Sequence, residues 1–143
     1  MLNKAIVMGR FVRDPELRRT QSGVAVASFT VAVDRDYASN GERETDFIPC
    51  VIWRQGAEFV EKYFRKGSMA VVSGRLQVRQ YTDKDGAKRS ITEIVADNVY
   101  FGESKRDRNE ADYEAAEKAG KQDYQPAGKP VSVEAEDDGE LPF

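Results

Sequence analysis

Two aromatic rings share one face of the stretch Asp46 to Arg54, whose residues predict a β-strand. The stretch is rich in aromatic and β-branched residues and contains no glycine. Because strand side chains alternate between faces, Phe47 and Trp53 lie on the same side, about 20 Å apart at roughly 3.3 Å of rise per residue. That spacing is too long for the rings to stack on each other, and it suits a surface that meets an extended ligand. The alternative is that both rings belong to a packed core, as most strand aromatics do.

Further rings and cations occur at comparable positions. Arg75 and Arg79 share one face of a second predicted strand, which Tyr81 continues, although an ordinary solvated face would look similar. Rings interleaved with cations are what single-stranded nucleic acid requires, because rings stack on unpaired bases and cations follow the phosphates. The expected stacking residues are Tyr37, Phe47, Trp53 and Tyr81, and the expected phosphate contacts are Arg18, Lys66, Arg75 and Arg79.

Catalytic constellations are missing from the sequence. It contains no histidine, which removes Ser-His-Asp triads and histidine metal sites, and it has no phosphate-binding P-loop motif. A group of carboxylates around a predicted hairpin could in principle hold magnesium for a nuclease. These residues are Asp34, Asp36, Glu42, Glu44 and Asp46. Since Arg35 and Arg43 interrupt them, we expect a solvated hairpin, and we expect no enzyme activity, cofactor or metal.

The positions of the predicted elements give the architecture. The predicted strands are Leu2–Val12, Val24–Asp34, Asp46–Arg54, Met69–Tyr81 and Ile91–Phe101, with one helix over Gln55–Phe64 and a polar loop over residues 13–23. Asn40-Gly41 and Asp85-Gly86 predict tight hairpin turns. Five strands with one helix between the third and fourth are the pattern of an OB-fold, a small partly open barrel that binds oligomers across its second and third strands.

Side-chain patterns indicate which faces are buried. Alternate residues from Ala25 to Val33 are apolar and predict a core face, and Cys50 is expected to be a small buried residue. The predicted core face of the helix consists of Ala57, Val60, Tyr63 and Phe64. In the strand from Met69, residues 72, 74, 76 and 78 form the expected apolar face. The opposite face, with Arg75 and Arg79, is expected to be exposed to solvent.

The charge is divided unevenly along the 143 residues. Residues 1–106 carry 18 Lys and Arg against 14 Asp and Glu, a net charge of +4, whereas residues 107–143 carry 4 against 11, a net charge of −7. We therefore predict a folded domain over 1–106 and a disordered acidic tail over 107–143. The single cysteine excludes an intrachain disulfide. Neither a signal peptide nor a membrane-spanning run is evident, which predicts a cytosolic protein.

The tail ends in a distinctive tip, residues 136–143. An acidic run precedes an apolar end, and a tail that served only solubility would not need that end. Acidic residues next to a ring and a free carboxylate are typical of a recognition tip for a basic pocket. The expected partner-binding residues are Asp137, Asp138, Glu140, Leu141, Pro142 and Phe143.

Several motifs together resemble the bacterial single-stranded DNA-binding protein family. The motifs that carry this resemblance are Asn3-Lys4 with the apolar run to Gly9, Asp14 to Arg18, Val26 to Phe29, Phe47 to Trp53, Phe64 to Ser68, Gly74 to Leu76, and Arg79 with Tyr81 to Asp83. The resemblance covers residues 1–104 and the last few residues, although Gly139 interrupts the acidic run and the linker looks short for the family.

The resemblance implies a homotetramer of OB domains that wraps single-stranded DNA without catalysis. It also implies a tail that recruits replication, recombination and repair enzymes, and a cytoplasmic, nucleoid-associated location. It supports the four stacking positions, with tyrosine at 37 and 81 where the family often has tryptophan, and phosphate contacts at Arg18, Lys66 and Arg79. Binding of RNA remains an alternative, because base stacking is insensitive to the 2′-hydroxyl.

Overall fold

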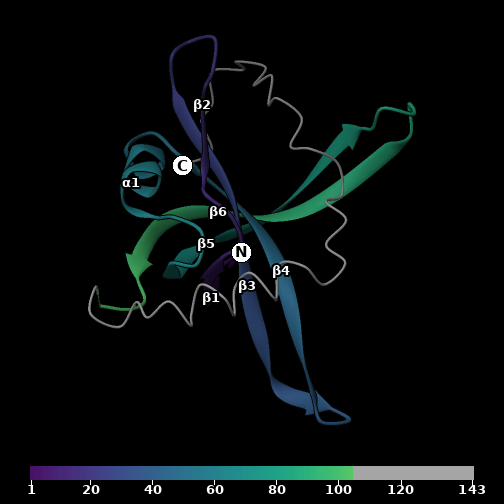
Figure 1. The fold of residues 1–143 in the computed structure, drawn as a ribbon. Coiled ribbons are helices and arrows are strands. Elements are labelled where there is room, and N and C mark those ends of the chain that lie inside the picture. Colours follow the sequence, from purple (N-terminus) through teal and green to yellow (C-terminus); the bar gives the residue numbers. More distant parts are fainter. Residues whose placement is uncertain (105–143) are drawn as a thin grey trace.

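A computed structural model describes residues 1–104 of the chain (Figure 1). The elements in this part are β1 (Ala5–Phe11), β2 (Glu16–Arg19), β3 (Ala25–Ser39), β4 (Glu42–Trp53), α1 (Gln55–Tyr63), β5 (Met69–Thr82) and β6 (Lys88–Phe101). The predicted tail over 107–143 lies outside the described residues, as does the end of the predicted domain at residue 106. Within residues 1–104, no helix has both the length and the apolar character needed to cross a membrane.

The strands form a barrel in the order β1-β5-β6-β4-β3, which a second pairing of β1 with β3 closes. Four of the neighbouring pairs are antiparallel, including the pair that closes the barrel, and β4 with β6 is parallel. The helix α1 lies between β4 and β5 along the chain. These findings confirm the predicted five-stranded OB-fold with one helix.

A short sixth strand, β2, extends the sheet along β3, in a segment that was predicted as loop. That prediction was wrong because Glu16-Leu17-Arg18-Arg19 is mostly charged and gives no strand signal by itself. Tertiary pairing supplies what composition lacks, since each residue of β2 lies opposite a residue of β3 and Leu17 packs on the core. The added strand places Arg18 and Arg19 on opposite faces of a sheet.

Three stacked phenylalanine rings form the centre of the core. The ring of Phe11 lies 4.7 Å from that of Phe29 and 5.1 Å from that of Phe64, between ring centroids. Phe64 follows α1, whose Ala57 and Val60 are fully buried, so one face of the helix covers the core. Cys50 is buried as expected, and burial together with the charge of Glu93 raises the pKa of its thiol to about 12.

Tyr63 does not join the core face that was predicted for the helix. Its ring is 47% exposed, and it contacts Phe59 and Phe101 on the flank of α1. Val60 and Phe64 are four residues apart and lie on the buried side of the last helical turn. Tyr63, the last residue of the helix, therefore projects from the flank of the helix and not into the core.

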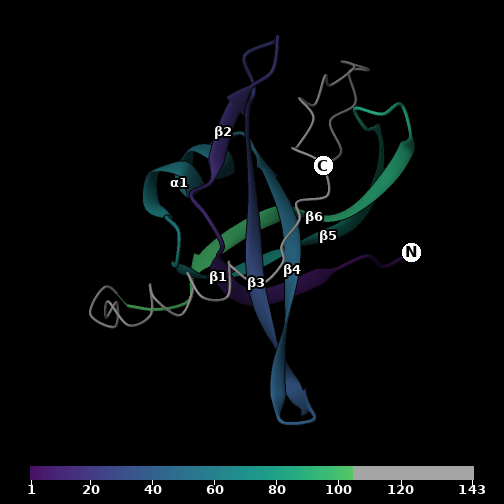
Figure 2. The ribbon, with the colours of Figure 1, turned by 45° about the vertical axis from the view of Figure 1, so that its right-hand side comes forward.

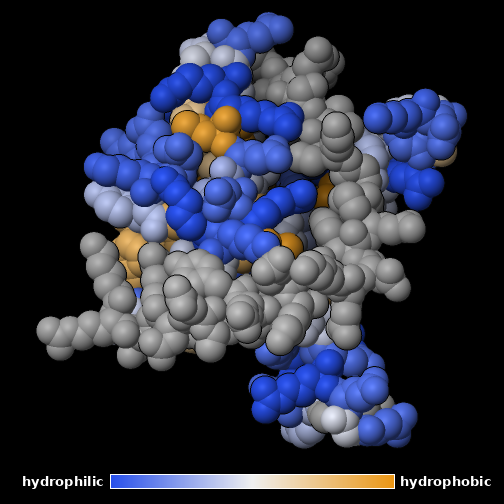
Figure 3. All heavy atoms as spheres, viewed as in Figure 1, coloured by the Kyte–Doolittle hydropathy of each residue, from blue (hydrophilic) through white to orange (hydrophobic). Residues whose placement is uncertain are grey.

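Two long hairpins project from the barrel in different directions (Figures 1 and 2). The turn between β3 and β4 has positive φ at Asn40 (55°) and Gly41 (82°), as the sequence predicted. Figure 3 shows that hydrophilic side chains cover much of both hairpins on the face in view. In the β3–β4 hairpin, Arg35 pairs with Asp46 (Nη2–Oδ1 2.9 Å) and with Glu44. The guanidinium of Arg35 thus lies among the carboxylates that the nuclease alternative needed for magnesium. Within residues 1–104, no three His, Cys, Asp or Glu side chains are arranged so that they could hold one metal ion.

The two faces of β5 differ in exposure from what the sequence predicted. Val72 and Gly74 are buried as expected, but Leu76 is 48% exposed and Val78 is 66% exposed. The predicted alternation of side chains between the two faces of β5 is correct. Beyond the register shift at Ser73/Gly74, however, the hairpin leaves the barrel, so the core no longer covers the apolar face of the strand. Conversely Arg75 and Arg79, expected on a wet face, are partly buried.

Candidate nucleic-acid interface

A second, smaller apolar cluster lies on the side of the sheet that faces away from the main core. Along β4, Cys50 and Ile52 point into the main core, whereas Val51 points the other way. Val51 packs with Val26 of β3 and Val95 of β6, and Trp53 is partly buried against them. Trp53 is therefore neither a core residue nor a loose surface ring. It has an apolar floor that holds it in place.

Cross-strand pairing extends this side of the sheet across five strands. One row of directly paired residues runs from β2 to β5 through Glu16, Ser28, Val51, Val95 and Arg75. Paired residues project from the same side of a sheet, so every member of the row shares the side of Val51. We call this side, with Arg18, Trp53 and the residues of the row, the outer face.

A second row joins two of the predicted site residues. Arg18 of β2 pairs with Val26, and Val26 pairs with Trp53 on its other side. Arg18 is exposed, and its Nη2 atom lies 3.2 Å from the carboxylate of Glu16 on the same strand. An exposed pair of this kind contributes little stability, so Arg18 can exchange Glu16 for another anion at little cost. The neighbouring Arg19 points away from the outer face and pairs with Glu58 of α1.

Strand β5 adds more cations to the outer face. Arg75, Arg79 and Tyr81 project from the same side of β5, together with Gln77, because they are separated by multiples of two residues. The guanidinium of Arg79 pairs with Glu93 of β6, with Nε–Oε1 at 3.2 Å and Nη2–Oε2 at 3.4 Å. Arg75 donates from Nη1 to Oε1 of Gln77 at 3.1 Å.

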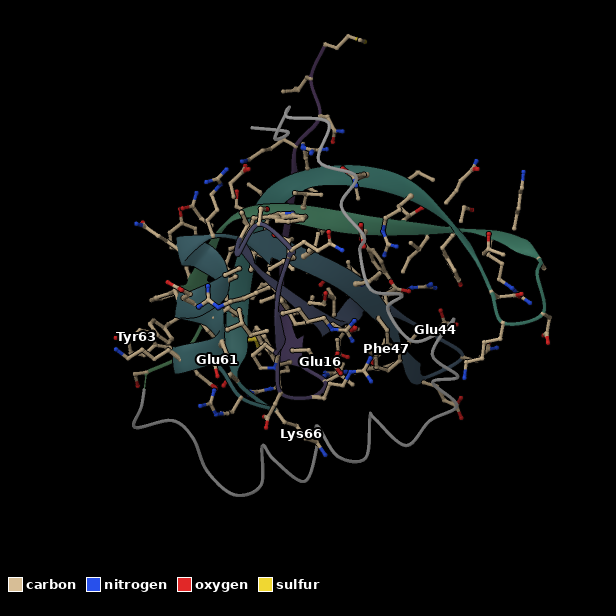
Figure 4. The ribbon with its side chains drawn as sticks, turned by 90° about the horizontal axis from the view of Figure 1, so that it is seen from above. Glu16, Glu44, Phe47, Glu61, Tyr63 and Lys66 are labelled. Carbon is tan, nitrogen blue, oxygen red and sulfur yellow. The ribbon has the colours of Figure 1, made fainter. Side chains whose placement is uncertain are left out.

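The remaining predicted residues are placed differently. Phe47 is partly buried and shares the side of Val51 and Trp53 on β4, as predicted. Figure 4 shows Phe47 and Glu44 apart from Tyr63 and Glu61, which belong to α1. Tyr37 is 88% exposed on the β3–β4 hairpin, where strand register shifts, so no row ties it to the outer face. Lys66 lies in the loop after α1, and its backbone N–H donates to Asp14 at 2.8 Å.

Sequence reasoning missed one functional candidate, Glu93. A signal existed, because Ile91, Glu93 and Val95 alternate on one face of β6 and a charge stands between two apolar side chains. The apolar floor of Val26, Val51 and Val95 was missed too, since its members come from three strands and meet only through pairing. The predicted tip, residues 136–143, lies outside the described residues.

The model of the single-strand binding protein family matches residues 2–102, which include all seven elements. The chain belongs to this family.

Two relatives in this family are similar along the whole chain, and a third along most of it. The chain is 42% identical to "Single-stranded DNA-binding protein 2" of Listeria monocytogenes and 46% identical to "Single-stranded DNA-binding protein 1" of Staphylococcus aureus, in each case over 100% of both proteins. A "Single-stranded DNA-binding protein" of Bacillus cereus is 54% identical over 71% of this chain and 60% of its own length. The family resemblance inferred from the motifs is thus confirmed.

Proposed function

We propose that this protein binds single-stranded DNA without sequence preference, through the outer face. One observation carries the proposal: pairing across five strands puts Arg18, Trp53 and Arg75 on one side of the sheet, outside the main core. Such a surface suits single-stranded DNA, because the flat faces of unpaired bases can stack on the ring and the phosphates can bind the arginines. The relatives that match the whole chain are named for the same activity.

Each predicted residue has a role in this proposal. Rings that stack on bases contribute roughly 1–3 kcal/mol per base with little dependence on which base it is. These rings are Tyr37, Phe47, Trp53 and Tyr81, and the phosphate contacts are Arg18, Lys66, Arg75 and Arg79. Trp53 is the best-supported ring because its floor of three valines holds it in place, and Tyr37 extends the surface along the hairpin.

The protein acts by binding rather than by catalysis. Two of the five candidate carboxylates of the β3–β4 hairpin, Glu44 and Asp46, are paired with Arg35, which argues against a metal-dependent nuclease. Incubation with labelled single strands and magnesium tests this, since cleavage would contradict the proposal. Competition between matched DNA and RNA oligomers tests the RNA alternative, which predicts that RNA displaces DNA at equal concentration.

Assembly into a homotetramer is supported by an apolar row that begins on β1, on the side of the sheet that faces away from the main core. Met8 pairs with Val71, and Val71 pairs with Tyr100, so an apolar row crosses three strands. Met8 is 52% exposed and Tyr100 is 54% exposed, which is costly for a free monomer. The substitution Met8→Glu should lower the mass measured by light scattering. An unchanged mass would place the subunit contacts elsewhere.

The cellular role that we propose is protection of single-stranded DNA in replication, recombination and repair. The acidic tip, residues 136–143, would recruit partner enzymes with basic pockets, in the cytoplasm and at the nucleoid. Deletion of residues 136–143 tests recruitment, because it should abolish capture of such enzymes on immobilised protein and leave DNA binding in place.

Titration of the intrinsic fluorescence with poly-dT tests the central proposal. Trp53 is the only tryptophan, so the signal has one source. Strong quenching that saturates at a fixed nucleotide-to-protein ratio would place Trp53 on a base. Unchanged fluorescence with binding detected by anisotropy would move stacking to the other rings, and absence of binding by either method would reject the proposed function.

A further inference from the structure

Glu93 places a buried carboxylate on the outer face, the proposed DNA-binding side of the sheet. The residue is 7% exposed, and its two carboxylate oxygens accept hydrogen bonds from Nε and Nη2 of Arg79. It lies directly opposite Gln77 on β5, between the positions of Arg75 and Arg79. A phosphate that binds Arg79 along this edge must therefore compete with a carboxylate that is already in place.

Arg75 has the complementary property. Its Nη1 atom donates to Gln77, whereas its Nη2 atom is buried and has no hydrogen-bond acceptor among residues 1–104. A buried donor without an acceptor is costly. Arg75 lies opposite Val95, which is two residues from Glu93 on the same side of β6. Such diagonal neighbours are roughly 7–8 Å apart, within reach of a side chain as long as arginine.

We propose that Glu93 is an internal counter-ion that DNA displaces from Arg79, and that Arg75 then receives the displaced carboxylate. This inference rests on the proposed function of the outer face and changes it at one position, since Arg75 would then hold Glu93 rather than a phosphate. After the exchange, Arg79 holds a phosphate, Glu93 keeps a cationic partner, and Nη2 of Arg75 gains the acceptor that it lacks. No buried charge is left unpaired at the end, which matters because an unpaired buried charge is strongly destabilising.

This exchange would favour long strands over small anions. A single phosphate gains one contact in return for displacing Glu93. A strand that stacks on Trp53 and contacts Arg18 at the same time keeps its next phosphate at high local concentration near Arg79. The internal counter-ion would thus discriminate against mononucleotides and inorganic phosphate.

A double-mutant cycle on the full chain tests the first half of the proposal. Glu93→Gln and Arg79→Gln are made singly and together, and binding to labelled poly-dT is measured by anisotropy. We expect Glu93→Gln to tighten binding about three- to tenfold, and we expect this gain to disappear in the Arg79→Gln background. An equal gain in both backgrounds would mean that only net charge matters, and no gain would mean that Glu93 does not compete; either result overturns the proposal. Should Glu93→Gln fail to fold, Glu93→Asp, which withdraws the carboxylate from Arg79, should give a smaller gain with the same dependence on Arg79.

The substitution Arg75→Gln tests the second half. If Arg75 receives the carboxylate, Arg75→Gln weakens binding in the wild-type background, and this loss is several-fold smaller in the Glu93→Gln background. Equal losses in both backgrounds would show that Arg75 acts on DNA independently of Glu93, and would overturn the exchange. A wild-type chain that does not bind poly-dT would reject the proposed function itself, which separates that failure from a failure of the exchange.

Discussion

Arg18 and Trp53 flank Val26 in one row of cross-strand neighbours. Because adjacent strands are about 4.8 Å apart, the backbone positions of Arg18 and Trp53 are roughly 10 Å apart, and both side chains project onto the outer face. Neither residue would be placed there by its own strand alone. The short strand β2 brings Arg18 into the row, and the pairing of β3 with β4 brings Trp53.

The substitution Arg18→Gln should weaken binding to poly-dT and flatten its salt dependence. Loss of one phosphate contact lowers the slope of log K against log salt by about 0.7 for a single strand. Arg19→Gln is the matched control, because Arg19 is the adjacent residue with the same charge but points to α1, where it pairs with Glu58. Anisotropy titrations at several salt concentrations measure both slopes. Equal changes in the two variants would contradict the assignment of Arg18 to the outer face.

Trp53→Leu should lower the affinity for poly-dT by roughly 5- to 150-fold, which corresponds to the 1–3 kcal/mol of one stacked base. Leucine keeps apolar contact with the valine floor, so the fold should persist. Tyr63→Leu is the control, since this half-exposed ring lies on the flank of α1 rather than on the outer face. An affinity for Trp53→Leu within twofold of wild type would exclude Trp53 as a major stacking platform.

Gly74→Ala should destabilise the sheet beneath the outer face. A Cβ atom at this position would lie 2.1 Å from the backbone oxygen of Val95 and 2.7 Å from the Cα atom of Ala96. Backbone cannot move aside cheaply, so we expect the free energy of unfolding to fall by about 1–3 kcal/mol, as measured by urea denaturation.

Gly56→Ala provides the comparison for Gly74→Ala. Its Cβ atom would lie 2.5 Å from Cδ1 and 2.7 Å from Cγ1 of the buried Ile52. Both are side-chain atoms, which can shift at a lower cost than backbone, so the loss should be smaller than for Gly74→Ala. Equal losses in the two variants would show that the close approach of β5 and β6 at Gly74 is not the decisive constraint.

Regular periodicity made most of the fold predictable from the sequence. Alternation from Ala25 to Val33 identified a buried face, and Asn40-Gly41 identified a turn whose residues do have positive φ. The two rings of β4 were placed on one side by alternation alone, and the comparison of Val51 with Cys50 confirms that this side is not the main core. Local sequence suffices where one strand decides the outcome.

Features that depend on several strands were not predictable in the same way. Strand β2 has no apolar pattern of its own and forms because β3 offers an edge. Leu76 and Val78 lie on the expected side of β5 but are exposed, because this part of the hairpin extends beyond the barrel and the core does not bury it. The pair of Arg79 with Glu93 joins residues 14 positions apart, and a single sequence does not show that such a pair forms.

Deletion of residues 107–143 should tighten binding to poly-dT at low salt. The deleted segment has a net charge of −7, so we expect it to compete with DNA for the cations of residues 1–106. The difference from the full chain should shrink as salt is added, because screening weakens this competition. Unchanged affinity at low salt would mean that the acidic tail does not compete with DNA.

Asp83 should make the stability of the β5–β6 hairpin depend on pH. Its carboxylate accepts a hydrogen bond from Nε of Arg89 at 2.6 Å and from the backbone of Ala87 and Asp85, which lowers its pKa in the folded protein. A carboxyl group with a lowered folded pKa stabilises the protein above its unfolded pKa, about 3.9, and this contribution is lost as the pH falls through the folded value. Asp83→Asn should therefore lower the unfolding midpoint at pH 6, and the difference from wild type should narrow progressively below about pH 4.

Asp85→Asn is the matched control for this prediction, because it removes a neighbouring charge in the same turn while the hydrogen bonds of the Asp83 carboxylate remain possible. Thermal unfolding followed by circular dichroism between about pH 2 and pH 7 measures all three proteins. A constant difference between Asp83→Asn and wild type over this range would show that the contribution of Asp83 does not depend on its charge. The hairpin turn would then depend on hydrogen bonds that asparagine accepts less well at every pH, and the charge of the pair with Arg89 would have no part in it.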